Sequence, residues 1–145
     1  MERIVECVPN FSEGRNEGII KEITDTIEAV AGVKLLDVDP GADTNRTVVT
    51  MVGSPQNVAE AVFQAVKRAA QLIDMRQHRG AHPRFGATDV VPFVPVSGVT
   101  MDDCVKLAGQ VGKRIGEDLG IPVYLYEHAA SRPERRNLSR VRTGE

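Results

Sequence analysis

The chain has 145 residues, of which 41% are hydrophobic and 26% charged, and its formal net charge is −2. This composition is typical of a soluble globular domain with one core, and it excludes a disordered or fibrous protein. The sequence contains no apolar run long enough to span a membrane, and the charged start MERIVECVPN argues against a signal peptide. Cys7 and Cys104 lie in apolar contexts, which predicts buried, reduced thiols and a cytoplasmic location.

The first half of the chain alternates between strand and helix patterns. Residues 3–9 are rich in Val and Ile and predict a strand, which the turn-rich loop NFSEGRNEG follows. Apolar residues then recur every three to four positions over residues 20–30, which predicts an amphipathic helix. Residues 33–39 and 46–53 predict two strands, and the short PGADTN turn between them predicts an antiparallel hairpin.

The second half continues in the same manner. A Ser-Pro pair at 54–55 begins a second helix, whose apolar stripe runs to Ile73. Residues 89–95 predict a strand with two prolines, which fit only a sheet edge, a strand end or a bulge. A capping-box pattern begins a third helix over residues 100–119, and residues 122–126 predict a last short strand.

The element order is therefore βαββαβ followed by an added αβ unit. The first six elements match the ferredoxin-like, split βαβ pattern of the α+β class. We predict one domain over residues 1–145, with a sheet of mixed strand direction and the helices packed on one face.

Polar side chains gather in three of the predicted loops, where strand ends commonly carry function. Asn10 follows the first strand, and Asp39, Asn45 and Arg46 surround the hairpin turn. The alternative for Asp39 and Asn45 is that they only build the turn. The third group precedes the fourth strand and consists of His78, Arg79, His82 and Arg84.

The stretch HRGAHPRFGATDVVPF holds two histidines interleaved with two arginines. Metal binding by His78 and His82 is disfavoured, because Gly80 and Pro83 oppose a regular helix there and no third ligand stands out. Proton transfer is favoured instead, since imidazole titrates near neutral pH and the arginines can bind carboxylates. The plain alternative is that both rings are surface residues without a role.

Long segments of the chain, in the same order, resemble glutamate formimidoyltransferase. The resemblance spans essentially the whole chain and corresponds to the amino-terminal subdomain of that family's transferase domain. The segments are VECVPNFSEG (5–14), LLDVD (35–39), TNRTVVTMVG (44–53), LIDMRQHRGAHPRFGATDVVPFVPV (72–96), PVYLY (122–126) and RRNLSRVRTGE (135–145).

The resemblance implies transfer of a formimino group from N-formimino-L-glutamate to tetrahydrofolate, a step of histidine degradation, without a metal. It makes His82 the catalytic histidine. It further implies a carboxy-terminal subdomain, absent from this chain, with folate in the groove between the two. We therefore expect folate or substrate contacts from the other polar loop residues, namely Asn10, Asp39, Asn45, Arg46, His78, Arg79 and Arg84.

Two other classes of function remain open. The chain is alternatively a stand-alone module that binds folate or a partner subunit without turnover. For either class we expect a homodimer or pairing with a carboxy-terminal half. Five arginines in residues 132–142 raise the question of nucleic acid, but that run has no interleaved aromatic residue for base stacking, so we expect no nucleic-acid partner.

Overall fold

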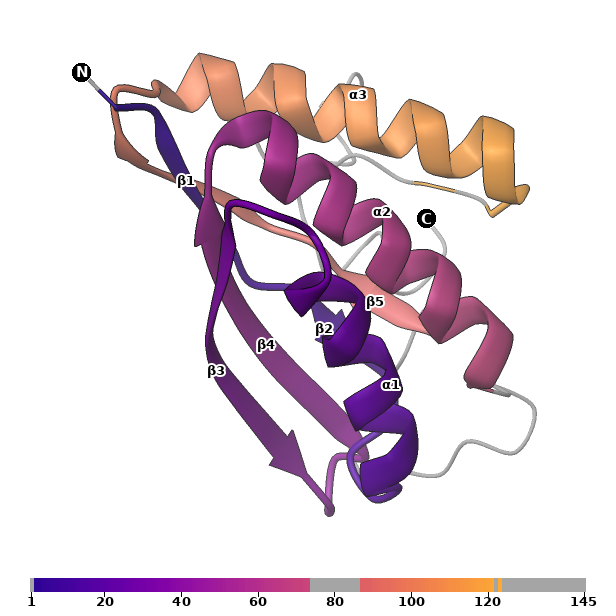
Figure 1. The fold of residues 1–145 in the computed structure, drawn as a ribbon. Coiled ribbons are helices and arrows are strands. Elements are labelled where there is room, and N and C mark those ends of the chain that lie inside the picture. Colours follow the sequence, from indigo (N-terminus) through magenta and orange to yellow (C-terminus); the bar gives the residue numbers. More distant parts are fainter. Residues whose placement is uncertain (1, 74–86, 122, 124–145) are drawn as a thin grey trace.

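A computed structural model describes residues 2–73, 87–121 and 123 of the chain. No helix in these ranges is long and apolar enough to cross a membrane. Figure 1 shows the arrangement of the elements. In chain order they are β1 (Ile4–Cys7), β2 (Asn10–Phe11), α1 (Glu17–Glu28), β3 (Val33–Gly41), β4 (Arg46–Gly53), α2 (Pro55–Leu72), β5 (Thr88–Val90), β6 (Phe93–Ser97) and α3 (Met101–Leu119).

Two of the predicted strands are each interrupted at a proline. The strand predicted over 3–9 becomes β1 and β2 on either side of Pro9, and the one predicted over 89–95 becomes β5 and β6 on either side of Pro92. The two interruptions lie side by side, because the Val8 N–H donates to the Pro92 carbonyl over 3.1 Å. Proline has no N–H to give to a sheet, so neither strand continues straight through. The strand predicted over 122–126 falls outside the described ranges apart from residue 123.

The sheet has the strand order of the ferredoxin-like pattern. β3 lies at one edge and pairs with β4, β1 and β2 follow, and β6 and β5 pair with them on the other side. All five strand pairings in the described part are antiparallel. This corrects the prediction of mixed directions between neighbours. The split βαβ unit does make β1 and β3 parallel, but β4 is inserted between them and runs opposite to both.

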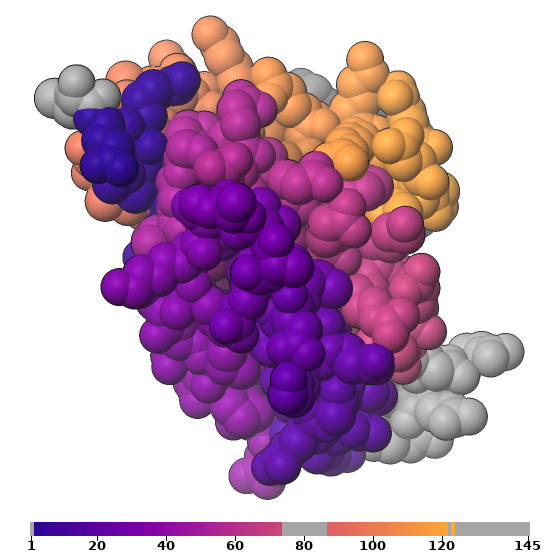
Figure 2. Space-filling view, viewed as in Figure 1, coloured from indigo at the N-terminus to yellow at the C-terminus, as the bar shows by residue number. Residues whose placement is uncertain are grey.

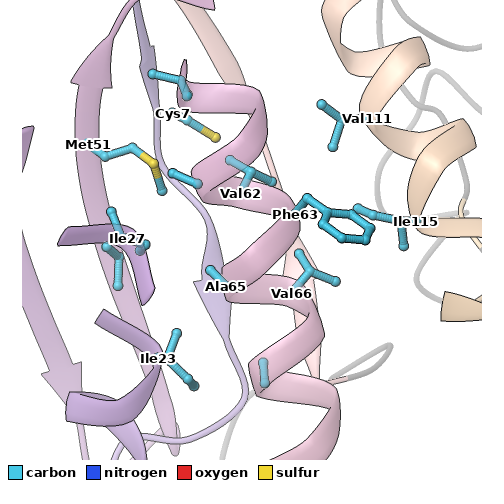
Figure 3. Close-up of a cluster of buried hydrophobic side chains, with 14 of the residues drawn as sticks. Cys7, Ile23, Ile27, Met51, Val62, Phe63, Ala65, Val66, Val111 and Ile115 are labelled. Atoms are coloured by element: carbon cyan, nitrogen blue, oxygen red, sulfur yellow. The ribbon is translucent and has the colours of Figure 1, made fainter. Parts of the chain in front are cut away.

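All three helices pack on one face of the sheet, as the sequence predicted. In Figure 1, α1 and α2 lie in front of the sheet and α3 runs along the top, and Figure 2 shows the helices from this side beside part of the sheet. The core lies between the two layers, where Figure 3 shows Met51 and Cys7 of the sheet facing Ile27 of α1 and Val62 of α2. These four side chains have no exposed surface. α3 covers the end of this core with a buried stripe that consists of Cys104, Leu107, Val111 and Ile115.

The helix ends confirm the signals in the sequence. The Ser54 side chain accepts a hydrogen bond from the Asn57 N–H at the start of α2. Thr100 and Asp103 form the complete capping box of α3. Gly120 ends α3 with φ 67°, a left-handed conformation that glycine adopts without steric cost.

Candidate functional site

Three of the predicted site residues share the sheet face opposite the described helices, which we call the open face. Asn10 and Asp39 pair with Val48 from opposite sides, and Arg46 lies two residues before Val48 on β4. Side chains two positions apart on a strand point to the same face. The intervening residue Thr47 points to the helices and is buried, which fixes the other three on the open face. Asp39 and Arg46 are therefore diagonal neighbours, about 7–8 Å apart.

The charges of this group are available to a ligand. Within residues 2–73 and 87–121, neither the Asp39 carboxylate nor the Arg46 guanidinium takes part in a hydrogen bond or an ion pair with another described group. Asp39 is exposed, whereas Asn10 is buried and its side-chain amide donates to the Val8 carbonyl over 3.1 Å. The arrangement presents a cation for carboxylates and a carboxylate for N–H donors on one surface.

Asn45 has a structural role in this site. It is buried, and its backbone has φ 50°, in the left-handed region that Asn tolerates better than most residues. Its side-chain oxygen accepts a hydrogen bond of 2.8 Å from the Gly14 N–H, and its own N–H donates to the Ala42 carbonyl over 3.2 Å. Asn45 therefore joins the β3–β4 turn to the loop before α1, in line with the turn-building alternative.

Gly14 allows that loop to approach the hairpin closely. A side-chain Cβ at this position would lie 2.2 Å from the Gly41 carbonyl oxygen and 2.6 Å from the Arg46 nitrogen, both backbone atoms. No side chain fits there without moving the hairpin. The backbone on either side of Arg46 is thus held in place by the loop of residues 12–15.

Further hydrogen bonds, which were not predicted from the sequence, also hold the loop of residues 12–15 against the β3–β4 hairpin. The Glu13 carboxylate accepts from the N–H groups of Arg15 and Asn16, over 2.9 and 3.0 Å, and the Arg15 Nε donates to the Ala42 carbonyl over 2.8 Å. The Thr47 hydroxyl donates to the Glu13 carbonyl. One signal was available in the sequence: Thr47 is a polar residue at an inward position of a strand, and such a hydroxyl needs a partner.

The remaining predicted site residues, His78, Arg79, His82 and Arg84, lie outside the described residues. The structure does describe the chain that follows them. The Ala87 carbonyl accepts a hydrogen bond of 2.8 Å from the Ser12 N–H, and Asn10 pairs with Val90 of β5. The chain after residue 86 therefore joins the sheet beside Ser12 and Asn10.

The described ranges hold no other candidate for a metal site or a reactive nucleophile. They contain no cluster of three or more His, Cys, Asp or Glu side chains that could hold a metal ion. Burial raises the pKa of the Cys7 thiol well above its ordinary value, and it also raises the pKa of Cys104. Both cysteines are free and buried, as predicted, and a protonated core thiol is a poor nucleophile.

Comparison with known protein families identifies the family of the chain. The family model for the amino-terminal subdomain of the formiminotransferase domain matches residues 4–145. The chain belongs to this family. The matched region of the formiminotransferase subdomain includes Asn10, Asp39 and Arg46. It also includes the segments next to them, namely the loop of residues 12–15, the hairpin turn and β5.

Curated relatives carry the same subdomain in longer proteins. The chain is 52% identical to glutamate formimidoyltransferase of Streptococcus pyogenes serotype M1 over all 145 residues, which is 48% of that protein. It is 54% identical over the same span to formimidoyltransferase-cyclodeaminase of Rattus norvegicus, or 27% of that protein. Over 139 residues it is 52% identical to glutamate formimidoyltransferase of Thermoplasma acidophilum, of which it covers 46%. The chain thus spans less than half the length of these formiminotransferase relatives.

Proposed function

We propose that this chain is the amino-terminal, catalytic-histidine part of a glutamate formimidoyltransferase. The observation that carries the proposal is identity above 50% over the full chain to proteins named for that activity. The reaction moves a formimino group from N-formimino-L-glutamate to N5 of tetrahydrofolate, which serves as the co-substrate, in histidine degradation. No metal takes part.

The open-face group suits both substrates of this reaction. Each substrate carries carboxylates, which a guanidinium binds through paired N–H donors, and we assign this role to Arg46. Each substrate also carries N–H groups. A carboxylate accepts hydrogen bonds from such groups, and we assign this role to Asp39. Asn10, whose amide oxygen remains an acceptor, lies beside Asp39 across β4 and extends the same surface.

The chemistry requires a group that moves protons. The folate amine attacks the formimino carbon and forms a tetrahedral intermediate, and the glutamate nitrogen leaves only after it is protonated. We assign two proton transfers to His82: it takes the proton that the attacking N5 loses and delivers a proton to the leaving glutamate nitrogen, because imidazole takes up and releases a proton near neutral pH. The hydrogen bond between the Ser12 N–H and the Ala87 carbonyl supports this assignment, since it brings the chain back to the sheet close to the candidate contacts only five residues after His82. His78, Arg79 and Arg84 are assigned to substrate carboxylates or to orienting the ring.

Full activity requires a carboxy-terminal half. The curated transferases are about twice as long as this chain, and an open sheet face can provide only one wall of a groove. We therefore place folate between the open face and that half, with residues 1–145 forming one domain. We place the protein in the cytoplasm, because both cysteines are free and buried.

The experiment mixes the 145-residue chain with the purified carboxy-terminal half of the Streptococcus pyogenes relative and measures formimino transfer. His82→Ala should lower turnover by about 10² to 10⁴, as expected for loss of a general acid/base, with little change in folinic acid binding by calorimetry. Arg46→Ala should instead weaken binding. His78→Ala is the matched control and should have a much smaller effect.

A second function is favoured by the open sheet face alone, which presents Asp39 and Arg46 to a ligand whether or not a proton-transfer group acts beside them. In that case the chain binds folate or a partner subunit without turnover. Folinic acid binding that persists while no mixture with a carboxy-terminal half turns over would support this module. Near-normal turnover in His82→Ala would contradict the catalytic assignment itself.

A further inference from the structure

A carboxylate lies within an apolar part of the open face. Glu6 of β1 pairs with Val52 of β4 on one side and with Val94 of β6 on the other, and the side chains of paired residues share a face. Neighbouring strands are about 4.8 Å apart, so the two valines lie about 5 Å to either side of Glu6. Ile4, two positions before Glu6 on β1, points to the same face. We call these four residues the Glu6 surface.

The Glu6 carboxylate is available to a ligand. Within residues 2–73, 87–121 and 123, it forms no hydrogen bond or ion pair with another described group. Lys34, which pairs with Val52 from β3, lies on the far side of that valine, about 10 Å from Glu6. Glu6 is half-buried, and a carboxylate that is partly removed from water gains most from N–H donors that a ligand brings to it.

We propose that the Glu6 surface binds the pterin ring of tetrahydrofolate and that Glu6 selects this ring. A pterin has two flat faces and, on one edge, two adjacent N–H donors, namely the ring N3–H and the 2-amino group. Flat faces pack on apolar side chains, and a few polar groups then fix the orientation of the ligand. The two donors match the two oxygens of a carboxylate, as the paired donors of a guanidinium do. The inference rests on the proposed function, because that function places folate on the open face.

Two other described carboxylates of the open face are less suited to this role. Asp37 and Asp39 are exposed and lie on β3, at an edge of the described sheet. Water competes there for the N–H donors of a ligand. The valines on either side of Glu6 exclude water instead, and a hydrogen bond is stronger where the local dielectric constant is lower.

Glu6 is also far enough from Arg46 for both reactants to be held at once. Arg46 and Val52, the partner of Glu6, lie six residues apart on β4, which corresponds to about 20 Å. A pterin at Glu6 and the carboxylates of formiminoglutamate at Arg46 therefore do not compete for the same protein groups. Asp39, the diagonal neighbour of Arg46, remains available to the N–H groups nearer to it.

Calorimetry on the chain mixed with the purified carboxy-terminal half of the Streptococcus pyogenes relative tests the inference with two probes. These are folinic acid and its analogue in which a methyl group replaces the 2-amino group. We expect wild type to bind the analogue about 10- to 100-fold more weakly, because a hydrogen bond to a charged group is lost. Glu6→Gln should bind folinic acid about 10- to 100-fold more weakly than wild type does. It should distinguish the two probes by less than about 3-fold.

A kinetic measurement separates this role from a structural one. In the transfer assay, Glu6→Gln should raise KM for tetrahydrofolate by about 10-fold or more, while kcat and KM for formiminoglutamate change by less than about 3-fold. Glu117→Gln, an exposed substitution on α3, is the matched control and should behave as wild type in both assays.

Three results would overturn the inference, with circular dichroism showing that the variant is folded. They are a wild type that binds both probes equally, a Glu6→Gln variant that still distinguishes them fully, and a Glu6→Gln variant that loses affinity for the carboxy-terminal half while it still distinguishes them. The third result would pair Glu6 with a cation of that half. Discrimination as expected without any transfer would support the inference and contradict the transferase activity, whereas a mixture that does not bind folinic acid would contradict both.

Discussion

Replacing Asn45 tests whether this residue acts on the fold or on a ligand. Asn45→Ala removes the acceptor of the buried Gly14 N–H, and an unsatisfied buried donor costs about 1–3 kcal/mol. It also places alanine at φ 50°, which costs about 1 kcal/mol more. We therefore expect the free energy of unfolding to fall by about 3 kcal/mol. For a domain of this size, that corresponds to about 10 °C in melting temperature.

Two further variants at the same position separate these contributions. Glycine adopts a positive φ without steric cost, but it also lacks the acceptor for the Gly14 N–H. Asn45→Gly should therefore destabilise the domain by about 1 kcal/mol less than Asn45→Ala. Asn45→Asp keeps an acceptor and should lose less than about 1 kcal/mol. Urea denaturation followed by circular dichroism measures all three. The reasoning fails if Asn45→Ala unfolds at the wild-type urea concentration, or if it reduces folinic acid affinity strongly while stability is unchanged.

Two other predictions concern the helix layer and the core. The guanidinium of Arg114, which also lies 3.6 Å over the Phe63 ring, donates to the Glu60 carboxylate and lowers the pKa of Glu60 below its ordinary value of 4.5. Glu60→Gln should therefore lower the free energy of unfolding by about 0.5–1 kcal/mol above about pH 5. As the pH falls through the lowered pKa, the urea midpoints of the variant and wild type should converge. A difference between the two midpoints that grows in acid would contradict this. Because the Cys7 and Cys104 side chains are buried, a disulfide reagent should reach both thiols only when the domain opens, and burial further slows the reaction by raising the pKa of each thiol. Rapid labelling of the native protein would show that the core is open.

Helices and strands could be predicted from the sequence where the interactions that form them lie between residues close together in the chain. The helices α1, α2 and α3 follow from apolar spacing and from caps within a few residues of each end, and the β3–β4 hairpin follows from its short turn. The proline at position 92 predicted an irregular strand, whereas the interruption at Pro9 was not predicted. The two interruptions lie side by side in the sheet because the Val8 N–H donates to the Pro92 carbonyl. These residues are far apart in the chain, so no local pattern predicts this hydrogen bond.

The candidate site divides in the same way. From the sequence, Asn10, Asp39 and Arg46 were predicted only as polar residues in loops near strand ends. Their common face depends on the register of β2, β3 and β4, which pairs both Asn10 and Asp39 with Val48 and which no local pattern contains. The role of Asn45 was not predictable, since its partner Gly14 lies 31 residues away and the hydrogen bond depends on a left-handed backbone. The identity of a polar residue at a turn does not reveal whether its side chain faces a ligand or the backbone.

The position of β1 has a consequence for how the protein is made. β1 leaves the ribosome before its neighbours in the sheet, because both of its edges are occupied by strands that come later, β4 and β6. Its wholly buried residues Val5 and Cys7 therefore have no complete environment until residue 97 has been synthesised. Pairing between distant segments is slow compared with helix formation, and unpaired apolar strands are what chaperones bind. The nascent chain must therefore carry β1 without its sheet neighbours until β6 has been made.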